Sequence, residues 1–110
     1  MLVRTWMAYA KPENARAYRD HLSATVLPKL EKVPGFLGLE LCEAQQRGEQ
    51  GARVELLVVT RWESMDAIKA FAGPEPDRAV VEPAARAMLE DYDDFAFHYT
   101  VTLEPRGKPQ

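Results

Sequence analysis

The sequence is poor in cysteine and has no long apolar run. Its single cysteine, Cys42, excludes an intramolecular disulfide and a thiolate metal cluster. No histidine lies near Cys42 in the sequence, so we expect a small apolar strand residue rather than a nucleophile. No stretch approaches the roughly 20 apolar residues of a membrane-spanning helix, and Arg4 interrupts the N-terminal apolar residues before a signal-peptide core develops. We expect a cytoplasmic protein without membrane association.

An excess of positive charge is also missing. Lysine and arginine number 14 against 17 aspartate and glutamate residues, for a net charge of -3, which argues against nucleic-acid binding. The sequence contains no nucleophile elbow, phosphate-binding glycine loop, zinc-ligand spacing or dinucleotide fingerprint. We therefore predict neither a metal site nor a cofactor. The acidic residues Asp91, Asp93 and Asp94 read as a solvated connection between two elements.

The length of 110 residues, 46% of them hydrophobic, suits one folded domain. We place this domain at residues 1–104, followed by a flexible C-terminal tail at 105–110. Its clearest unit spans residues 54–73. A β-branched apolar run predicts a strand over 53–62, Ser64 can cap the helix predicted over 65–72, and Gly73 followed by Pro74 ends that helix. Trp62 lies at the corner between strand and helix.

Alternation and helical periodicity predict the remaining elements. A strand is expected over 2–10, and a helix from about residue 13 carries one apolar stripe that Pro28 should kink or break. A second strand over 36–43 should place Leu37, Leu39 and Leu41 on one face. The polar residues 44–52 predict a hairpin connection. A further helix is expected in the later half of 78–92, and a last strand is expected over 95–103. The residues of the first apolar stripe are Ala15, Tyr18, Leu22, Val26, Leu30 and Val33.

The element order βαββαβ predicts an α+β, ferredoxin-like fold: a four-stranded antiparallel sheet with helices on one face. The third strand is nevertheless apolar on both faces, since Val54, Leu56 and Val58 oppose Leu57 and Val59. A monomer would leave one of these faces in water. We therefore predict a homodimer in which the two sheets face each other.

Several segments together resemble a known family. They are VRTW at 3–6, PENARAYRDHL at 12–22, KVPGFLGLEL at 32–41, VVTRWESMDAIKAFAGPEPDRAVV at 58–81 and FAFHYTV at 95–101. This combination resembles the antibiotic biosynthesis monooxygenase (ABM) family over nearly the whole chain. The resemblance implies a ferredoxin-like fold that pairs into a dimeric α/β barrel. It also implies one of two activities, cofactor-free oxygenation of polycyclic phenols or haem degradation.

The haem-degrading branch of that family uses a first-strand asparagine, an aromatic residue and an iron-ligating histidine in the second helical region. In this sequence Trp6 takes the place of the asparagine and Phe71 could stand for the aromatic residue. Residues 79–92 contain no histidine, and neither His21 nor His98 falls where that branch places its ligand. The resemblance therefore does not extend to haem ligation. Trp6, Trp62, Tyr92 and Arg4 are side chains of the kinds that the cofactor-free branch uses, without a position-by-position match.

Six residues are candidates for a site. Arg4 shares a face of the first strand with Trp6, and it either caps a buried carboxylate or lines a pocket. His98 is either a general base or a hydrogen-bonded interface residue. Trp62 either plugs the strand-to-helix corner or contacts a substrate. We take Arg4 and His98 as candidate catalytic residues; the candidate substrate-binding residues are Trp6, Trp62, Phe71 and Tyr92.

Our first hypothesis is a cofactor-independent monooxygenase that acts on a small aromatic, phenolic or quinone-like substrate. The alternative is a non-catalytic dimeric barrel that binds a small aromatic molecule, because a fold does not fix a function. Haem degradation is the third hypothesis, and the missing histidine argues against it. A polar group converging on an apolar cavity would favour the enzyme.

Overall fold

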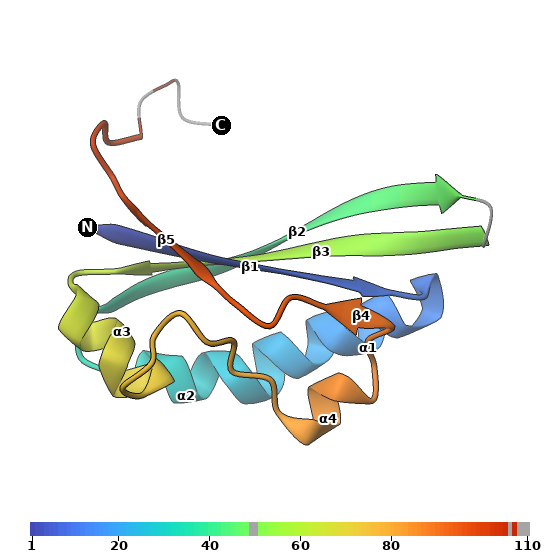
Figure 1. Ribbon diagram of the computed structural model, residues 1–110, viewed down its shortest axis with the longest axis horizontal. Coiled ribbons are helices and arrows are strands. Elements are labelled where there is room, and N and C mark those ends of the chain that lie inside the picture. Colours follow the sequence, from blue (N-terminus) through green and yellow to red (C-terminus); the bar gives the residue numbers. More distant parts are fainter. Residues whose placement is uncertain (49–50, 106, 108–110) are drawn as a thin grey trace.

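One antiparallel sheet and a layer of helices on one of its faces make up the structure (Figure 1). The computed structural model describes residues 1–48, 51–105 and 107, so most of the predicted tail at 105–110 lies outside it. The strands are β1 (Leu2–Ala10), β2 (Phe36–Gly48), β3 (Gly51–Trp62), β4 (Asp91–Tyr92) and β5 (Phe97–Thr100); the helices are α1 (Pro12–His21), the π-helical segment η1 (Leu22–Val26), α2 (Leu27–Glu31), α3 (Met65–Ala72) and α4 (Pro83–Arg86).

The sheet follows the order β2-β3-β1-β4, with β5 on the same edge of β1 as β4. β5 pairs with residues 2–5 of β1, whereas β4 pairs with Ala8 and Tyr9. The predicted ferredoxin-like fold is confirmed, but the predicted last strand over 95–103 is shorter, since within it only Phe97–Thr100 forms a strand. Asp93 N–H still donates to Met7 O of β1 at 3.0 Å, but residues 94–96 leave the sheet edge because they bond to a different segment: Ala79 N–H donates to Asp94 O, and Ala96 N–H donates to Asp77 O.

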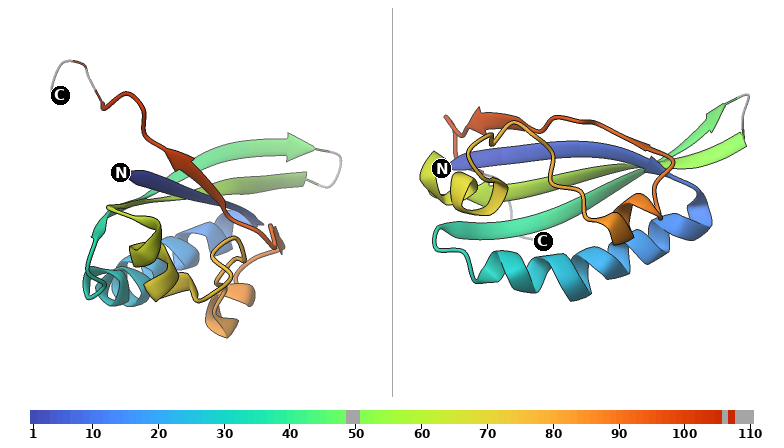
Figure 2. Two further views of the ribbon diagram at one scale, coloured as in Figure 1. Left: turned by 60° about the vertical axis from the view of Figure 1, so that its left-hand side comes forward. Right: turned by 60° about the horizontal axis from the view of Figure 1, so that its bottom comes forward.

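The first helix runs under the sheet as one continuous rod made of α1, η1 and α2 (Figure 2). Pro28 has no N–H to donate, so the regular α pattern cannot pass through it. The preceding turn is π-helical instead, and Leu27 N–H bonds to Leu22 O. The interruption predicted at Pro28 therefore takes the form of a π-helical turn that begins before the proline. Tyr18, Leu22 and Leu30 of the predicted stripe are buried against the sheet.

Two predictions about β2 differ from the structure. The hairpin connection expected over 44–52 does join β2 and β3, but it is shorter than predicted, because the two strands stay paired until Gly48 meets Gly51. Their polar side chains bond across the strands, as Gln46 does with Glu55 at 3.1 Å, and such pairs stabilise a ladder without burial. The register also shifts between Phe36 and Gly38. As a result Leu37 is half exposed rather than facing the helices with Leu39.

The unit around Trp62 is confirmed, but the helix predicted in the later half of 78–92 is mostly absent. α3 spans the predicted residues, and the Ser64 hydroxyl accepts a hydrogen bond from Ala67 N–H at 3.2 Å. α4 is only one turn long. Beyond it, Glu90 N–H donates to Tyr9 O, and Asp91–Tyr92 forms β4. Pairing with the open edge of β1 therefore outweighs the helical tendency of residues 87–92.

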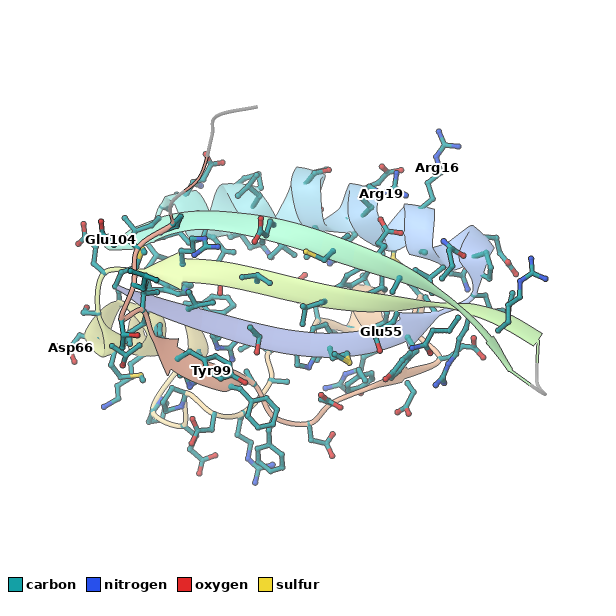
Figure 3. All side chains as sticks on the ribbon, turned by 90° about the horizontal axis from the view of Figure 1, so that it is seen from above. Arg16, Arg19, Glu55, Asp66, Tyr99 and Glu104 are labelled. Carbon is teal, nitrogen blue, oxygen red and sulfur yellow. The ribbon has the colours of Figure 1, made fainter. Side chains whose placement is uncertain are left out.

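The two faces of the sheet differ in what covers them. The inner face packs Trp6, Ala8 and Leu56 against the helices, and a second core gathers around Trp62 and Ile68. On the outer face, Phe97 and Tyr99 are each 55% exposed. Figure 3 shows this face with Glu55 and Tyr99 on it. Within the described residues, no helix is long and apolar enough to cross a membrane.

Candidate active site

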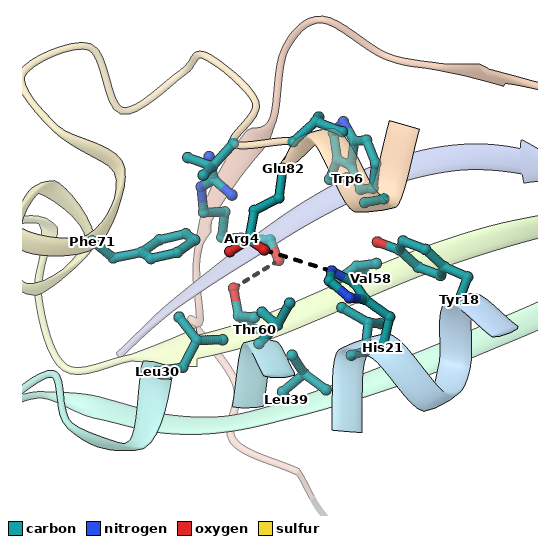
Figure 4. A pocket seen from close by; sticks show the side chains of 15 residues that line it. Arg4, Trp6, Tyr18, His21, Leu30, Leu39, Val58, Thr60, Phe71 and Glu82 are labelled. Atoms are coloured by element: carbon teal, nitrogen blue, oxygen red, sulfur yellow. Dashed lines mark hydrogen bonds and ion pairs between the residues drawn. The ribbon is translucent and has the colours of Figure 1, made fainter. Parts of the chain in front are cut away.

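A cavity of about 70 Å³ lies between the inner face of the sheet and the helices (Figure 4). β1 and β3 form its floor, α1 and α3 contribute side walls, and the segment before α4 closes it with Val80, Val81 and Glu82. The lining is mostly apolar. Five polar or charged side chains interrupt it: Arg4, Tyr18, His21, Thr60 and Glu82. An apolar hollow with a few converging polar groups is the usual form of a small-molecule site.

Arg4 is a buried cation on the inner face of β1, and its residue is only 7% exposed. Its Nη2 donates to the carbonyl oxygens of Pro76 at 3.3 Å and Arg78 at 3.0 Å. Its Nε has no hydrogen-bond partner among the described residues, and its guanidinium lies 5.6 Å from the centre of the Phe71 ring. Burial lowers the pKa of Arg4, and the nearby Asp77 carboxylate opposes this change. The side chain nevertheless stays charged.

No carboxylate lies within 4.0 Å of the Arg4 guanidinium among the residues described. The geometry thus matches the pocket-lining interpretation of Arg4 rather than that of a cap on a buried acid. A buried charge normally requires an opposite charge or full hydrogen bonding. Arg4 therefore retains the capacity to bind an anionic oxygen at the cavity.

Opposite Arg4, His21 and Glu82 form an imidazole–carboxylate pair. The His21 side chain is 8% exposed, and its Nε2 lies 3.8 Å from Glu82 Oε2 without a hydrogen bond. The other oxygen, Oε1, accepts a hydrogen bond from Lys29 Nζ at 2.9 Å. This bond lowers the pKa of Glu82, the charges of Lys29 and His21 add to the effect, and burial opposes it. Glu82 is therefore held as a carboxylate beside the imidazole.

Sequence reasoning did not place His21 and Glu82 in the site. Because His21 directly precedes the stripe residue Leu22, the sequence places it at the edge of the packed face of the first helix. Helical spacing did contain a signal: His21 follows Tyr18 by three positions, which puts the two on one helix face. Glu82 lies outside regular structure, and its sequence neighbours carry no pattern that would indicate a site.

Tyr18 and Thr60 supply the remaining hydroxyl groups. Tyr18 is 4% exposed, and burial raises the pKa of its phenol well above the usual value, so its proton stays in place. Its hydroxyl makes no hydrogen bond to the part of the chain that the structure describes. The Thr60 hydroxyl instead accepts from Trp62 Nε1 at 2.8 Å and lies 3.5 Å from Arg4 O. Tyr18 is therefore a free donor, and Thr60 is not.

Three of the six predicted residues line the cavity. Arg4 does, as does Phe71. Trp6 lines it as well, and its Nε1 donates to Asp93 O at 2.6 Å. The structure therefore brings Arg4, Trp6 and Phe71 together.

The other three lie outside the lining. Trp62 is fully buried between Phe36 and Phe71, with ring centres at 5.3 and 5.7 Å, which is the corner-plug arrangement. Tyr92 packs on Trp6 at 6.0 Å. His98 is opposite Arg4 in the β1–β5 register, and its Nδ1 lies 3.1 Å from Asp77 Oδ1.

His98 helps to anchor residues 76–82, the covering segment of the cavity, and does not line the cavity itself. Burial lowers the pKa of its imidazole and so does the charge of Arg4, whereas the charge and hydrogen bond of Asp77 oppose the change. A neutral ring can donate its Nδ1 proton to Asp77. Together with the two bonds from Arg4 to the carbonyls of residues 76 and 78, this contact holds the segment in three successive residues. The Asp91, Asp93 and Asp94 positions form no metal-binding cluster in the described chain.

Comparison with known proteins gives the family. No curated protein matches the sequence. A Bacillus cereus protein assigned as an antibiotic biosynthesis monooxygenase has a similar structure at 20% identity, with a TM-score of 0.68 and coverage of 96% and 97% of the two chains. The haem-degrading protein of Mycobacterium tuberculosis is 25% identical, with a TM-score of 0.58 and coverage of 97% and 98%. A monooxygenase of Streptomyces coelicolor in complex with nanaomycin D is 19% identical, with a TM-score of 0.54 and coverage of 99% and 90%.

These likenesses concern the fold. The family assignment depends on the match of residues 1–83 to the family model for antibiotic biosynthesis monooxygenase. That range contains Arg4, Tyr18, His21 and Glu82, so the polar groups of the cavity fall inside the matched region. The chain belongs to the antibiotic biosynthesis monooxygenase family.

Proposed function

We propose that the protein is a cofactor-independent monooxygenase that converts a small phenol to a quinone in this cavity. The observation that carries the proposal is Arg4, a buried guanidinium that lines an apolar cavity and has no carboxylate within 4.0 Å among the described residues. Such a group favours the charged form of a phenol, because a phenolate supplies the missing anion. A phenolate is also the electron-rich form that reacts with oxygen.

In this proposal the overall reaction is phenol plus O₂ giving quinone plus water. A ring carbon of the phenolate forms a bond to one oxygen atom of O₂, and the product is a ring hydroperoxide. The proton on that carbon then leaves while the O–O bond breaks, so the carbon becomes a carbonyl. The departing oxygen takes up protons and leaves as water. One oxygen atom enters the product, and O₂ accepts the four electrons that the ring loses.

The chain supplies the charges and the base for these steps. Arg4 holds the phenolate oxygen, and His21 Nε2 is the base that accepts the proton from the ring carbon. Glu82 stabilises the imidazolium that results, because its carboxylate lies 3.8 Å away. Trp6 and Phe71 provide apolar walls that keep water from the reacting carbon. His21 thus takes the role that the sequence alone suggested for His98.

Oxygen uptake tests the proposal directly. The purified protein is given a panel of phenols from one ring (hydroquinone) to three rings (anthrone), and O₂ consumption is followed together with quinone absorbance. We expect turnover that falls at least 100-fold in His21→Gln and in Arg4→Met. The matched control His98→Gln, outside the lining, should keep most of the activity. Turnover unaffected by His21→Gln would refute the residue roles, and the absence of turnover across the panel would refute the function.

Haem degradation does not suit this site. Small-molecule sites usually measure about 300–1,000 Å³, and a porphyrin falls within that range, whereas the cavity is about 70 Å³. Its one histidine, His21, already faces the Glu82 carboxylate. Added haemin should therefore give no protein-bound Soret shift.

The apolar lining of the cavity also supports a second candidate, a non-catalytic module that binds a small aromatic molecule. In that case, ligand binding would be retained in His21→Gln and no oxygen would be consumed.

We further propose that a second copy covers the outer face as a homodimer. The support is the exposure of Phe97 and Tyr99 beside an open groove of about 420 Å³ that Met7 and Leu57 also line.

A further inference from the structure

We propose that residues 80–89 form a flap that opens to admit small molecules to the cavity, and that Lys29 latches this flap shut through its ion pair with Glu82. The flap comprises the end of the covering segment, α4 and the turn that follows α4. Lys29 is thereby assigned as a positioning residue for Glu82. The inference concerns access to the cavity, so it holds for any small molecule that the cavity takes and does not depend on the proposed oxygenase.

The first argument is the backbone of the flap. In the described chain, the backbone hydrogen bonds of residues 80–89 all join two residues of the flap. The residues on either side are bonded to other parts of the chain, since Ala79 N–H donates to Asp94 O at 2.9 Å and Glu90 N–H donates to Tyr9 O at 2.8 Å. A segment that is fixed at both ends and bonded only to itself between them can move as a unit without losing backbone hydrogen bonds.

The second argument is the place of the flap in the cavity wall. Val80, Val81, Glu82 and Ala85 all line the cavity, and Val80 is 46% exposed on the surface. The floor is fixed, because β1 and β3 pair along their common length. Figure 1 shows α4 at the side of the helical layer that is remote from the sheet. The flap is therefore the wall that can open without disturbing the sheet.

The third argument is the way the flap is held. Within the described residues, every hydrogen bond and ion pair between the flap and the rest of the chain involves the Glu82 carboxylate. Its Oε1 accepts a hydrogen bond from Lys29 Nζ at 2.9 Å, and its Oε2 lies 3.8 Å from His21 Nε2. Figure 4 shows this carboxylate extending from the flap toward His21. The remaining hold is apolar, with Ala85 buried in the core.

The exposure of the ion pair suits a latch that opens repeatedly. The Lys29 side chain is 62% exposed and that of Glu82 is 34% exposed, and ion pairs in contact with water are weak. Opening of the flap also withdraws Glu82 from His21. The imidazole therefore has its carboxylate only when the flap is closed, and Lys29 links closure of the cavity to assembly of the His21–Glu82 pair.

Alkylation of a thiol inside the cavity tests the flap without turnover. Thr60→Cys places a sulfur on the cavity lining, and Val58→Cys provides a second reporter on the same strand. The probe is iodoacetamide, a small uncharged molecule whose iodide the thiolate displaces. The exposed native Cys42 reports the intrinsic rate in the same molecule, and peptide mass spectrometry separates the two sites.

In both reporter backgrounds, we expect Lys29→Met to speed alkylation of the cavity thiol by about two- to fivefold relative to Cys42, the range that loss of an exposed ion pair allows. Lys29→Arg retains the ion pair and should keep the parent rate. The matched control is Lys32→Met, which removes the same charge from the end of the same helix, where Lys32 has no ion pair within the described chain.

Salt provides an independent measurement. Raising the salt concentration from about 0.01 M to about 1 M shortens the screening length from about 30 Å to about 3 Å. This change should speed alkylation of the cavity thiol in the parent reporter and have no effect in the Lys29→Met variant. An unchanged rate in Lys29→Met, or an equal increase in Lys32→Met, would overturn the inference. Insensitivity of the parent reporter to salt would also overturn it.

Discussion

Arg4 both stabilises the covering segment of the cavity and carries the charge that the proposed ligand needs. Its Nη2 bridges the carbonyl groups of Pro76 and Arg78, so a residue from the first strand fixes a segment more than 70 positions away in the sequence. Its position on an apolar strand face is what makes Arg4 a candidate site residue from the sequence. The sequence did not indicate the hydrogen-bond partners of Arg4, because these are backbone carbonyl groups, which every residue has.

Replacing Arg4 by methionine should destabilise the protein. The change keeps the apolar stem but leaves two carbonyls without their donor, at a cost of about 1–3 kcal/mol, part of which is offset because a buried charge is removed. Urea denaturation measures the free energy of unfolding. The control Arg61→Met breaks an exposed ion pair with Glu40 at 3.5 Å and should cost less than about 1 kcal/mol. Equal effects of the two variants would contradict this account of Arg4.

Trp62 is the residue whose loss should cost most stability. It is fully buried and packs between Phe36 and Phe71. Trp62→Ala should lower the free energy of unfolding by about 3–5 kcal/mol, as large aromatic deletions do in cores. Thermal or urea denaturation provides the measurement, with Leu103→Ala, at a side chain that is 74% exposed, as the control. A loss below 1 kcal/mol would show that the corner repacks.

At the scale of elements, two glycines allow the stability cost of a left-handed backbone conformation to be compared with the cost of a steric clash. Gly35 and Gly73 both have left-handed backbone angles, with φ of 90° and 87°. A Cβ added at Gly35 would lie 2.7 Å from the Ala67 Cβ, whereas the space beside Gly73 is open. Gly35 also accepts a hydrogen bond from Glu63 N–H at 2.8 Å, so it fixes the approach of α3 to the end of α2.

Gly73→Ala should therefore lower the free energy of unfolding by about 1–2 kcal/mol, the cost of the left-handed backbone conformation alone. Gly35→Ala should cost about 1–3 kcal/mol more, because Ala67 and α3 must shift to admit the methyl group. Urea denaturation of the two variants side by side gives the difference. Equal losses would mean that α3 moves freely, and a larger loss in Gly73→Ala would contradict the packing.

The elements also show where local pattern reasoning succeeds. α3 has a capping serine, an apolar face and a terminal glycine, all within ten residues, and its bounds were predicted correctly. β2 and β4 were mispredicted because their pairing partners decide their extent. Residues 44–48 are polar and pair only because β3 lies beside them. Residues 91–92 become a strand because the edge of β1 is open there.

At the scale of the whole molecule, His98 should make stability depend on pH. Its folded-state pKa is lowered by burial and by Arg4, so the unfolded chain takes up the proton first as pH falls. The free energy of unfolding should be constant above the ordinary histidine pKa of about 6.5 and should decrease as pH drops below it. Urea denaturation between pH 5 and 8, a range above the region where Glu82 titrates, tests this. His98→Gln should flatten the profile, and an unchanged slope would contradict the assignment.

Substitutions on the exposed outer face of the sheet test the predicted homodimer. We expect a dimer by light scattering and a shift towards monomer in the double variant Phe97→Glu, Tyr99→Glu, because two charges would be buried between the sheets. Arg16→Glu, on the exposed side of α1 (Figure 3), is the control and should remain dimeric. A monomeric parent protein would remove the dimer from the proposal.

The sequence by itself determined the ferredoxin-like class, the unit from β3 to α3 and the two alternating faces of β1, because alternation, capping and apolar periodicity are local properties; only the tertiary structure decided which face of β1 turns toward the helices. The sequence also singled out Arg4, Trp6 and Phe71. Only the tertiary structure decided that His21 and Glu82, 61 positions apart in the numbering, meet at 3.8 Å, and that His98 turns to Asp77 instead. The physical reason is that a cavity forms where separate elements pack imperfectly. Which side chains face that space depends on the π-helical turn at Leu22–Val26 and on the anchored segment before α4.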